Sequence, residues 1–178
     1  LLNGIYSPSL TSEQFPLEIK SHVNIVGFNS DSVILDAEHT SRVITMKYCE
    51  NSIISDLTIT NGVAVGSQSS EGHHGGGLYL YSANANLSNI NIIENTARLF
   101  GGGIAILYSS AVLTNMIIVD NETELFAPSF GGGIYLDNSN VIIADMLISG
   151  NTAVRGGGIY MYYSDPILLN VTIVSNLV

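Results

Sequence analysis

The stretch Gly131-Gly132-Gly133-Ile134-Tyr135-Leu136 decides how this chain folds, because a glycine triplet followed by a short apolar run occurs four times. The other copies begin at Gly75, Gly101 and Gly156, so that successive triplets are 26, 30 and 25 residues apart. A period of this length is typical of a stacked repeat, since one such unit cannot bury its apolar face alone.

Two polar columns accompany the triplets. Counting from the first glycine, an Asn or Asp arrives 14 residues later and an Asn arrives 20 residues later in every unit. The first column is Asn89, Asn115, Asp145 and Asn170, and the second is Asn95, Asn121, Asn151 and Asn176. Asn tolerates the left-handed backbone of a tight turn, and its amide can bond to an Asn in the next unit. We therefore predict that both columns are structural ladders.

Apolar residues within each unit are two positions apart, which is the periodicity of a strand and not of a helix. One column that the units share is Ile92, Ile118, Ile148 and Ile173, and it predicts a single buried row. We predict an all-β fold, a right-handed parallel β-helix (a solenoid) of about six coils, each with three short strands that pair with the next coil at ~4.8 Å. Longer loops are expected at one corner, since only the segment between the second Asn and the next triplet varies in length.

The whole chain, residues 1–178, reads as one β-helix domain. Residues 1–41 form irregular first coils, residues 42–74 a coil with a long loop, and residues 75–178 the four glycine-led coils. The chain does not begin with Met, and its last coil carries no polar cap. We expect it to be part of a longer chain, with a flanking domain or another copy in contact with an uncapped end.

The composition of the chain disfavours several classes of binding partner. The net charge of −10, from 15 acidic and 5 basic residues, disfavours nucleic acid, anionic membranes and enzymes that degrade polyanions. No apolar run reaches 18 residues, so membrane insertion is not expected. The single Cys49 excludes an internal disulfide, which a parallel β-helix does not need in an extracellular location.

A motif before two of the triplets carries a resemblance. Asn95-Thr96-Ala97 precedes Gly101, and Asn151-Thr152-Ala153 precedes Gly156. This pattern is similar to the repeats of polymorphic outer-membrane proteins and to related pectin-lyase-like β-helix repeats of bacterial surface proteins. The resemblance implies an extracellular or cell-surface location and a β-helix, but not one activity, because the fold supports lyases, hydrolases and adhesins alike.

Tyrosines on the glycine-led strand form the first candidate site. Stacking the units places Thr45, Tyr79, Ala105, Tyr135 and Tyr160 in one outward column and Lys47, Tyr81, Leu107, Asp137 and Tyr162 in the next. Such a strip could stack on sugar rings while its hydroxyls hydrogen-bond to them, so we expect ligand-binding residues Tyr79, Tyr81, Tyr135, Asp137, Tyr160 and Tyr162. The alternative is that Tyr is simply a good strand residue.

Acidic and histidine residues at the loop-bearing corner form a second candidate. Asp36, Glu38 and His39 precede one lead strand, and Glu71, His73 and His74 precede the next. If adjacent coils bring them together, they could bind a divalent metal or act as acid and base. Their spacing is no metal signature, and a solvated polar loop is the alternative.

Asp120, Glu122 and Glu124 could supply carboxylate oxygens to calcium at the next corner, although no calcium-loop spacing is present and an acidic surface explains them as well. No other cofactor is expected.

These observations favour a non-enzymatic scaffold or adhesin module that contacts a polysaccharide or surface glycan. A polysaccharide lyase or glycoside hydrolase on the same face is the first alternative, and a self-assembling fibre subunit is the second.

Overall fold

The computed structural model describes residues 1–66, 70–125 and 128–178. Its strands are β1 (Gly4–Tyr6), β2 (Leu17–Ile19), β3 (Ile25–Val26), β4 (Val33–Asp36), β5 (Ile44–Lys47), β6 (Glu50–Thr60), β7 (Val63–Ala64), β8 (Leu78–Tyr81), β9 (Asn84–Ile93), β10 (Thr96–Ala97), β11 (Ile104–Leu107), β12 (Val112–Val119), β13 (Glu122–Thr123), β14 (Ile134–Asp137), β15 (Ile142–Ser149), β16 (Ile159–Tyr162) and β17 (Ile167–Val174). The helical turns are α1 (Pro8–Thr11) and the 3-10 helix η1 (Ser70–His73). Among the described residues, no helix has the length and apolar character needed to cross a membrane.

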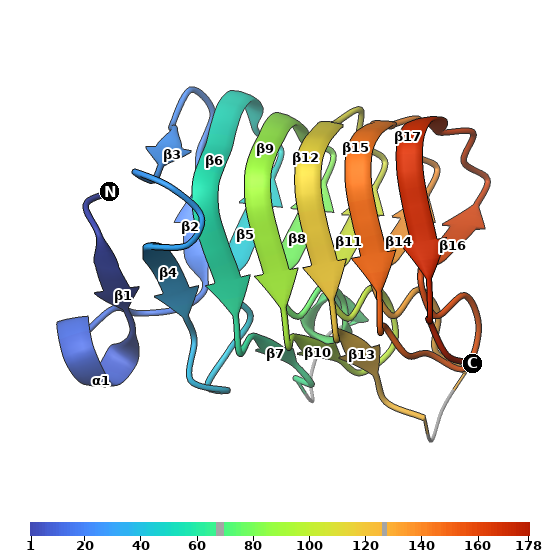
Figure 1. Ribbon diagram of the computed structural model, residues 1–178, viewed down its shortest axis with the longest axis horizontal. Coiled ribbons are helices and arrows are strands. Elements are labelled where there is room, and N and C mark those ends of the chain that lie inside the picture. Colours follow the sequence, from blue (N-terminus) through green and yellow to red (C-terminus); the bar gives the residue numbers. More distant parts are fainter. Residues whose placement is uncertain (67–69, 126–127) are drawn as a thin grey trace.

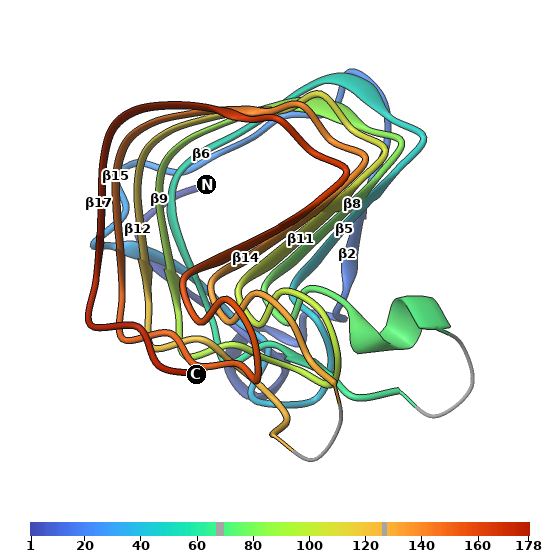
Figure 2. The same ribbon diagram turned by 90° about the vertical axis from the view of Figure 1, so that its right-hand side faces the viewer.

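Three parallel sheets run along the molecule, as the prediction required (Figure 1). The largest follows the order β1-β4-β6-β9-β12-β15-β17, the second β16-β14-β11-β8-β5-β2, and the third β13-β10-β7. The second sheet has six strands, one from each coil. Figure 2 shows the coils superposed around a common interior. The predicted parallel β-helix of about six coils is therefore confirmed.

The interior is built from in-register apolar rows. Ile92 pairs with Ile118, which pairs with Ile148, and all three side chains are fully buried. Ile173, on the last coil of the structure, continues the register beyond Ile148 and is half-exposed. The predicted buried row is confirmed for the first three positions.

The strands divide differently from the prediction of three short ones per coil. The segments on either side of Asn89 join into one strand of 10 residues, β9, while the third sheet uses strands of two residues. Asn89 still makes the predicted bend, with φ of 55°, and Asn115 and Asn170 in its column do the same. A single left-handed residue turns the chain without interrupting the pairing of its neighbours, so the strand continues through the corner.

Each glycine of a triplet meets a different steric limit. Gly101 has φ of 65°, which favours glycine. A Cβ on Gly102 would lie 2.3 Å from the carbonyl oxygen of Glu122, and one on Gly103 would lie 2.8 Å from that of Gly133. The triplet therefore marks a point where backbone segments of neighbouring coils approach closely.

The N-terminal segment contains a helical turn that the sequence analysis did not predict. Ser7 caps α1 by accepting a hydrogen bond from the Leu10 N–H at 3.3 Å, and Pro8 occupies the first helical position. Ser followed by Pro is a known start signal for a helix. The turn has only four residues, too few for any periodicity to reveal it.

Candidate functional site

The two columns of the lead-strand face stack as predicted. Thr45, Tyr79, Ala105, Tyr135 and Tyr160 are in register across β5, β8, β11, β14 and β16, and Lys47, Tyr81, Leu107, Asp137 and Tyr162 form the neighbouring column. The strands thus place six side chains of the expected binding strip on one outward face.

The expectation that this strip is exposed is wrong for two of its residues. Tyr79 is 1% exposed and Tyr135 is 6% exposed, and both belong to a second apolar cluster outside the coils. Both tyrosines are covered by residues that come just before the glycine triplets. The ring of Phe100 stacks on Tyr135 with centroids 4.6 Å apart, and the ring of His74 meets the edge of Tyr79 at 5.8 Å.

Arg42 completes the cover over Tyr79. Its guanidinium carbon lies 4.7 Å from the centre of the Tyr79 ring, and Nε donates to the carbonyl oxygens of His74 and Gly75 at 3.0 and 2.8 Å. Cation–π contacts of this kind stabilise when partly desolvated. Tyr79 is therefore a packing residue, and it cannot present a face to a ligand.

The other end of the strip is open. Phe100, Phe130, Tyr135, Tyr160 and Tyr162 line a cavity of about 270 Å³, called the aromatic cavity below. Tyr135 and Tyr160 stand nearly parallel, with centroids 6.0 Å apart and an interplanar angle of 7°. Burial raises the pKa of Tyr135, and the charge of Asp137 raises it further. The Tyr135 hydroxyl consequently stays protonated and able to donate a hydrogen bond.

The acidic and histidine residues at the loop-bearing corner are directed to different partners, contrary to the expected convergence. Glu38 accepts hydrogen bonds from the Ser7 hydroxyl at 2.8 Å, from the Ser9 N–H at 3.1 Å and from the Ser9 hydroxyl. Asp36 accepts from the N–H of Glu38 at 2.8 Å and from the Asn61 amide at 3.0 Å. The unpredicted helical turn α1 explains the difference, because it brings donors that take up the Glu38 carboxylate.

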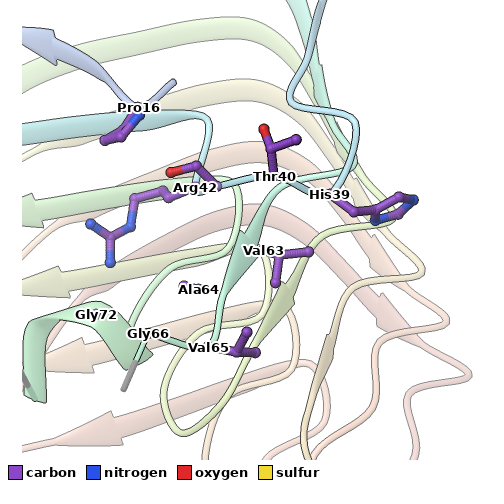
Figure 3. Close-up of a pocket in the computed structure, with 10 residues that line it drawn as sticks. Pro16, His39, Thr40, Arg42, Val63, Ala64, Val65, Gly66 and Gly72 are labelled. Atoms are coloured by element: carbon purple, nitrogen blue, oxygen red, sulfur yellow. The ribbon is translucent and has the colours of Figure 1, made fainter. Parts of the chain in front are cut away.

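The histidines of that corner also separate. His74 is buried between Tyr79 and Phe100, while His39 borders a hollow of about 460 Å³ that Arg42 and Val63 also line. Figure 3 shows His39 and Arg42 pointing to different sides of this hollow. His73 ends η1, and the side chain of Glu71 lies outside the described residues. No acid–base pair is formed by the residues of this corner that the structure describes.

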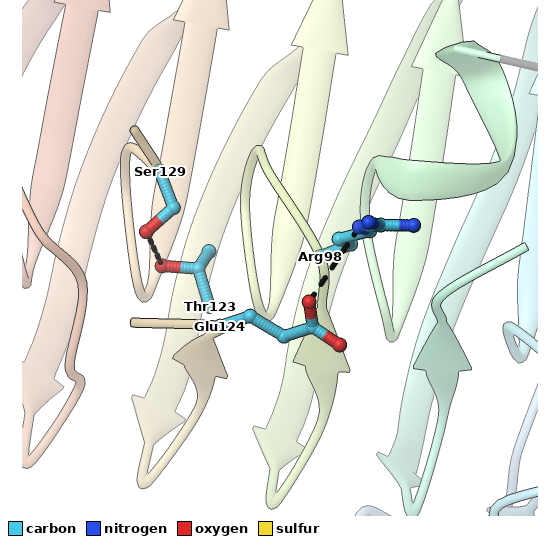
Figure 4. A network of polar contacts seen from close by, with 4 residues as sticks. All are labelled: Arg98, Thr123, Glu124 and Ser129. Carbon is cyan, nitrogen blue, oxygen red and sulfur yellow. Dashed lines mark hydrogen bonds and ion pairs between the residues drawn. The ribbon is translucent and has the colours of Figure 1, made fainter. Parts of the chain in front are cut away.

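Two acidic residues of the third candidate, Glu122 and Glu124, have separate partners. Glu124 lies 3.6 Å from the guanidinium of Arg98, and the hydroxyl of Thr123 beside it bonds to the Ser129 hydroxyl at 2.8 Å (Figure 4). Glu122 accepts a long hydrogen bond from the Thr96 hydroxyl at 3.4 Å. Across the ranges described, no group of three or more His, Cys, Asp or Glu is arranged to hold a metal ion.

The second Asn column forms a ladder in the interior. Asn95, Asn121 and Asn151 are fully buried, and each accepts at Oδ1 from the backbone N–H of the preceding coil. Gly62 occupies the ladder position in the coil before Asn95. The left-handed residue at this corner is the one before the Asn, such as Glu94 with φ of 57°. These bonds join each Asn of the column to the coil before it.

The first Asn column is exposed and bonds through side chains. Asn115 donates to Asn89 at 2.6 Å, and Asn170 donates to Asp145 at 2.7 Å.

A serine ladder at the remaining corner was not predicted. The N–H of Ser109 donates to the hydroxyl of Ser139 at 3.0 Å, and the N–H of Ser139 donates to that of Ser164 at 3.0 Å. Its signal in the sequence is a Ser eight residues after the first glycine of each later triplet.

One group of exposed aromatic residues was not predicted from the sequence. Tyr48, Tyr108 and Tyr163 directly follow lead strands, and all three residues are exposed. A Tyr one position beyond the strand in alternate units was the available signal.

Comparison with known proteins agrees with this architecture. No curated protein and no solved structure matches the chain. A profile of the family described as "Right handed beta helix region" matches residues 22–178. Since this match covers all but the first 21 residues and the coils pair in parallel throughout, the chain belongs to the right-handed β-helix family.

Proposed function

We propose that this chain is a non-enzymatic, extracellular scaffold module of a bacterial surface or secreted protein, which contacts a glycan through the aromatic cavity. The observation that carries the proposal is that the described residues lining that cavity are five aromatic side chains. Aromatic faces stack on the apolar faces of sugar rings, and phenol hydroxyls supply polar contacts at their edges.

Contacts within the aromatic cavity hold two of its rings in place. Phe130 lies 4.7 Å from Tyr160, centroid to centroid, and Arg155 lies 5.7 Å from the Phe130 ring. These contacts limit the rotation of Phe130 and Tyr160 before any ligand arrives. A preorganised site loses less side-chain entropy on binding.

A scaffold role follows from the ladders. Buried Asn and Ser columns bond each coil to the next, which makes the stack stiff along its axis. The apolar side chains exposed on the last coil, among them Leu168 and Ile173, suit contact with a further coil, a flanking domain or a second copy. The likeness of the Asn-Thr-Ala repeats to those of bacterial surface proteins supports the proposed location.

Binding is favoured over catalysis by the lining of the cavity. Hydrolysis of a glycosidic bond generally uses two carboxyl groups that flank the bond. The five lining side chains include no carboxyl group, and Asp137 is the acidic residue whose charge acts on Tyr135. The described residues that line this cavity supply rings to hold a sugar and no pair of acids to cleave it.

The test is a glycan array with the wild-type chain, followed by titration calorimetry of the best ligand with variants. Tyr160→Ala removes one face of the cavity and is expected to weaken binding at least about tenfold, or 1.4 kcal/mol. Tyr160→Phe retains the ring and should bind nearly as the wild type does. Phe28→Ala, at an exposed aromatic residue elsewhere, is the control.

An array with no ligand would reject the proposal, as would equal affinity of the Tyr160→Ala and wild-type chains. Release of unsaturated or reducing sugars from the bound glycan would show that the chain is an enzyme.

A further inference from the structure

Three tyrosines lie at one corner of the stack in a backbone conformation that bulky residues rarely adopt. Tyr48, Tyr108 and Tyr163 have φ of 52°, 52° and 45°, in the left-handed region. Their side chains are 69%, 53% and 75% exposed, so burial does not repay the strain, which is of the order of 1–3 kcal/mol for each residue. We call these three residues the tyrosine ridge.

The corner itself does not require an aromatic residue. Ser82 and Asn138 occupy the same position in the intervening coils, with φ of 47° in both. Ser and Asn are the common solutions for such a turn, because their short polar side chains bond locally. Retention of strained, solvated tyrosines in alternate coils therefore points to a role for their exposed rings.

Neighbouring rings hold the ridge in place. Tyr81 fits between Tyr48 and Tyr108, with its centroid 5.4 Å from the first and 5.6 Å from the second, both edge-to-face. Tyr162 supports Tyr163 in the same way at 4.4 Å. Edge-to-face pairs are a favourable arrangement of aromatic rings, so the ridge is ordered without a ligand.

The ridge has a regular spacing. The backbone N–H groups of Tyr48, Ser82, Tyr108 and Asn138 each bond to the next coil, so the five corner residues advance by one coil at a time. One coil is ~4.8 Å, and aromatic rings therefore recur every ~9.6 Å. Asn138 occupies the corner between Tyr108 and Tyr163, and its side-chain amide is held by a hydrogen bond that it donates to Asp137 at 2.7 Å.

We infer that the tyrosine ridge binds one extended β-1,4-linked chain of neutral hexose or N-acetylhexosamine units, lying parallel to the helix axis. Successive rings of such a chain are turned by half a rotation, so the same face recurs at every second ring. One sugar then corresponds to one coil, with a face stacked on each Tyr and hydroxyl or amide groups directed to Ser82 and Asn138.

The net charge of the chain supports a neutral ligand. With −10 overall, and with Asp137 beside the ridge, the surface repels polyuronates and other polyanions. A proline-rich peptide is the other extended ligand that aromatic residues recognise, but it advances ~3.1 Å per residue and docks in grooves. The tyrosine ridge is a convex corner, and the described residues that line the two hollows above do not include its three tyrosines.

This inference deepens the proposed function, because both take a glycan as ligand, but it concerns a separate site. The probes are cellohexaose and chitohexaose, with cellobiose and chitobiose as short versions, maltohexaose as the α-linked control and a proline hexapeptide as the competing class. A hexasaccharide spans the ~19 Å, or four coils, from Tyr48 to Tyr163, whereas a disaccharide meets one Tyr at a time.

Calorimetry with the wild-type chain is expected to show at least tenfold tighter binding of a β-1,4-linked hexasaccharide than of its disaccharide or of maltohexaose. The triple variant Tyr48→Ala, Tyr108→Ala and Tyr163→Ala should weaken hexasaccharide binding at least tenfold. Phe28→Ala should leave the affinity unchanged, and circular dichroism melting verifies that each variant is folded.

The outcomes separate the two sites. If Tyr160→Ala abolishes binding and the triple ridge variant binds as the wild type does, the ridge inference is overturned and the proposed function stands. If only the ridge variant loses binding, the inference stands and the aromatic cavity is not the site. Binding of the proline hexapeptide in place of the glycans, or equal binding of maltohexaose, would also overturn the inference.

Discussion

The backbone N–H and the side-chain amide of Asn121 both donate to Oδ1 of Asn151, at 3.0 and 2.9 Å, inside the coil stack. The same Asn121 amide donates to the carbonyl oxygen of Ile92 at 2.9 Å. One buried side chain thus satisfies groups of its own coil and of both neighbours, which explains why an Asn recurs at a corner that no solvent reaches.

Asn121→Ala should lower the free energy of unfolding by at least about 2 kcal/mol. It removes the acceptor of the buried Asn95 N–H and one donor to the carbonyl of Ile92, and a buried unsatisfied group costs about 1–3 kcal/mol. Urea denaturation followed by circular dichroism measures the change. Asn91→Ala, at a half-buried outward position of β9, is the matched control and should stay within about 0.5 kcal/mol. Equal effects of the two substitutions would contradict the ladder.

Gly102→Ala should lower the free energy of unfolding by about 3 kcal/mol or more, because the added methyl group would overlap atoms that cannot move away. Its Cβ would lie 2.3 Å from the Glu122 carbonyl oxygen and 2.5 Å from that of Gly132, both backbone atoms held by parallel pairing. Gly66→Ala is the control, since its Cβ would come no closer than 3.5 Å to an atom of the other described residues. Melting temperatures measure both, and a Gly102→Ala chain as stable as the wild type would refute the close approach of the backbones.

Ile118→Ala and Ile117→Ala separate the two faces of β12. Ile118 is fully buried and Ile117 is 41% exposed, although the two are adjacent in the chain. Truncation of a buried Ile lowers the free energy of unfolding by about 2–5 kcal/mol, whereas Ile117→Ala should lower it by about 0.5 kcal/mol. Chemical denaturation of both variants tests the assignment of inward and outward faces, which a reversed order of stability would overturn.

Acidification should destabilise the N-terminal helical turn α1. Hydrogen bonds from Ser9, then Ser7, lower the pKa of Glu38 below its ordinary value of 4.5. A lowered carboxyl pKa means that the stabilisation is complete above the unfolded value and is lost as the pH falls through the folded one. Hydrogen exchange of residues 7–12 should therefore accelerate below about pH 4.5, and in Glu38→Gln it should lose this pH dependence. Exchange that is independent of pH in the wild type, after correction for intrinsic rates, would contradict the contact.

The repeat could be predicted well because its information is local and periodic. The spacing from Gly101 to Asn115 and Asn121 recurs in every unit, and only a stack of equal coils places such positions together. The columns of Tyr79, Ala105 and Tyr135 followed from the same spacing and agree with the observed register. Where the period is absent, as in residues 1–41, the turn α1 and its bonds to Glu38 were not foreseen.

The sequence by itself determined the stack of coils, the inward and outward positions and the polar columns, since these depend on separations along the chain that every unit repeats. Tertiary structure alone decided which outward residues meet solvent. Tyr79 and Tyr135 are covered by His74 and Phe100, whereas Tyr108 on the adjoining corner is exposed. The physical reason is that the covering side chains come from the corner whose loops vary in length, where the period places no constraint on what folds back over the sheet.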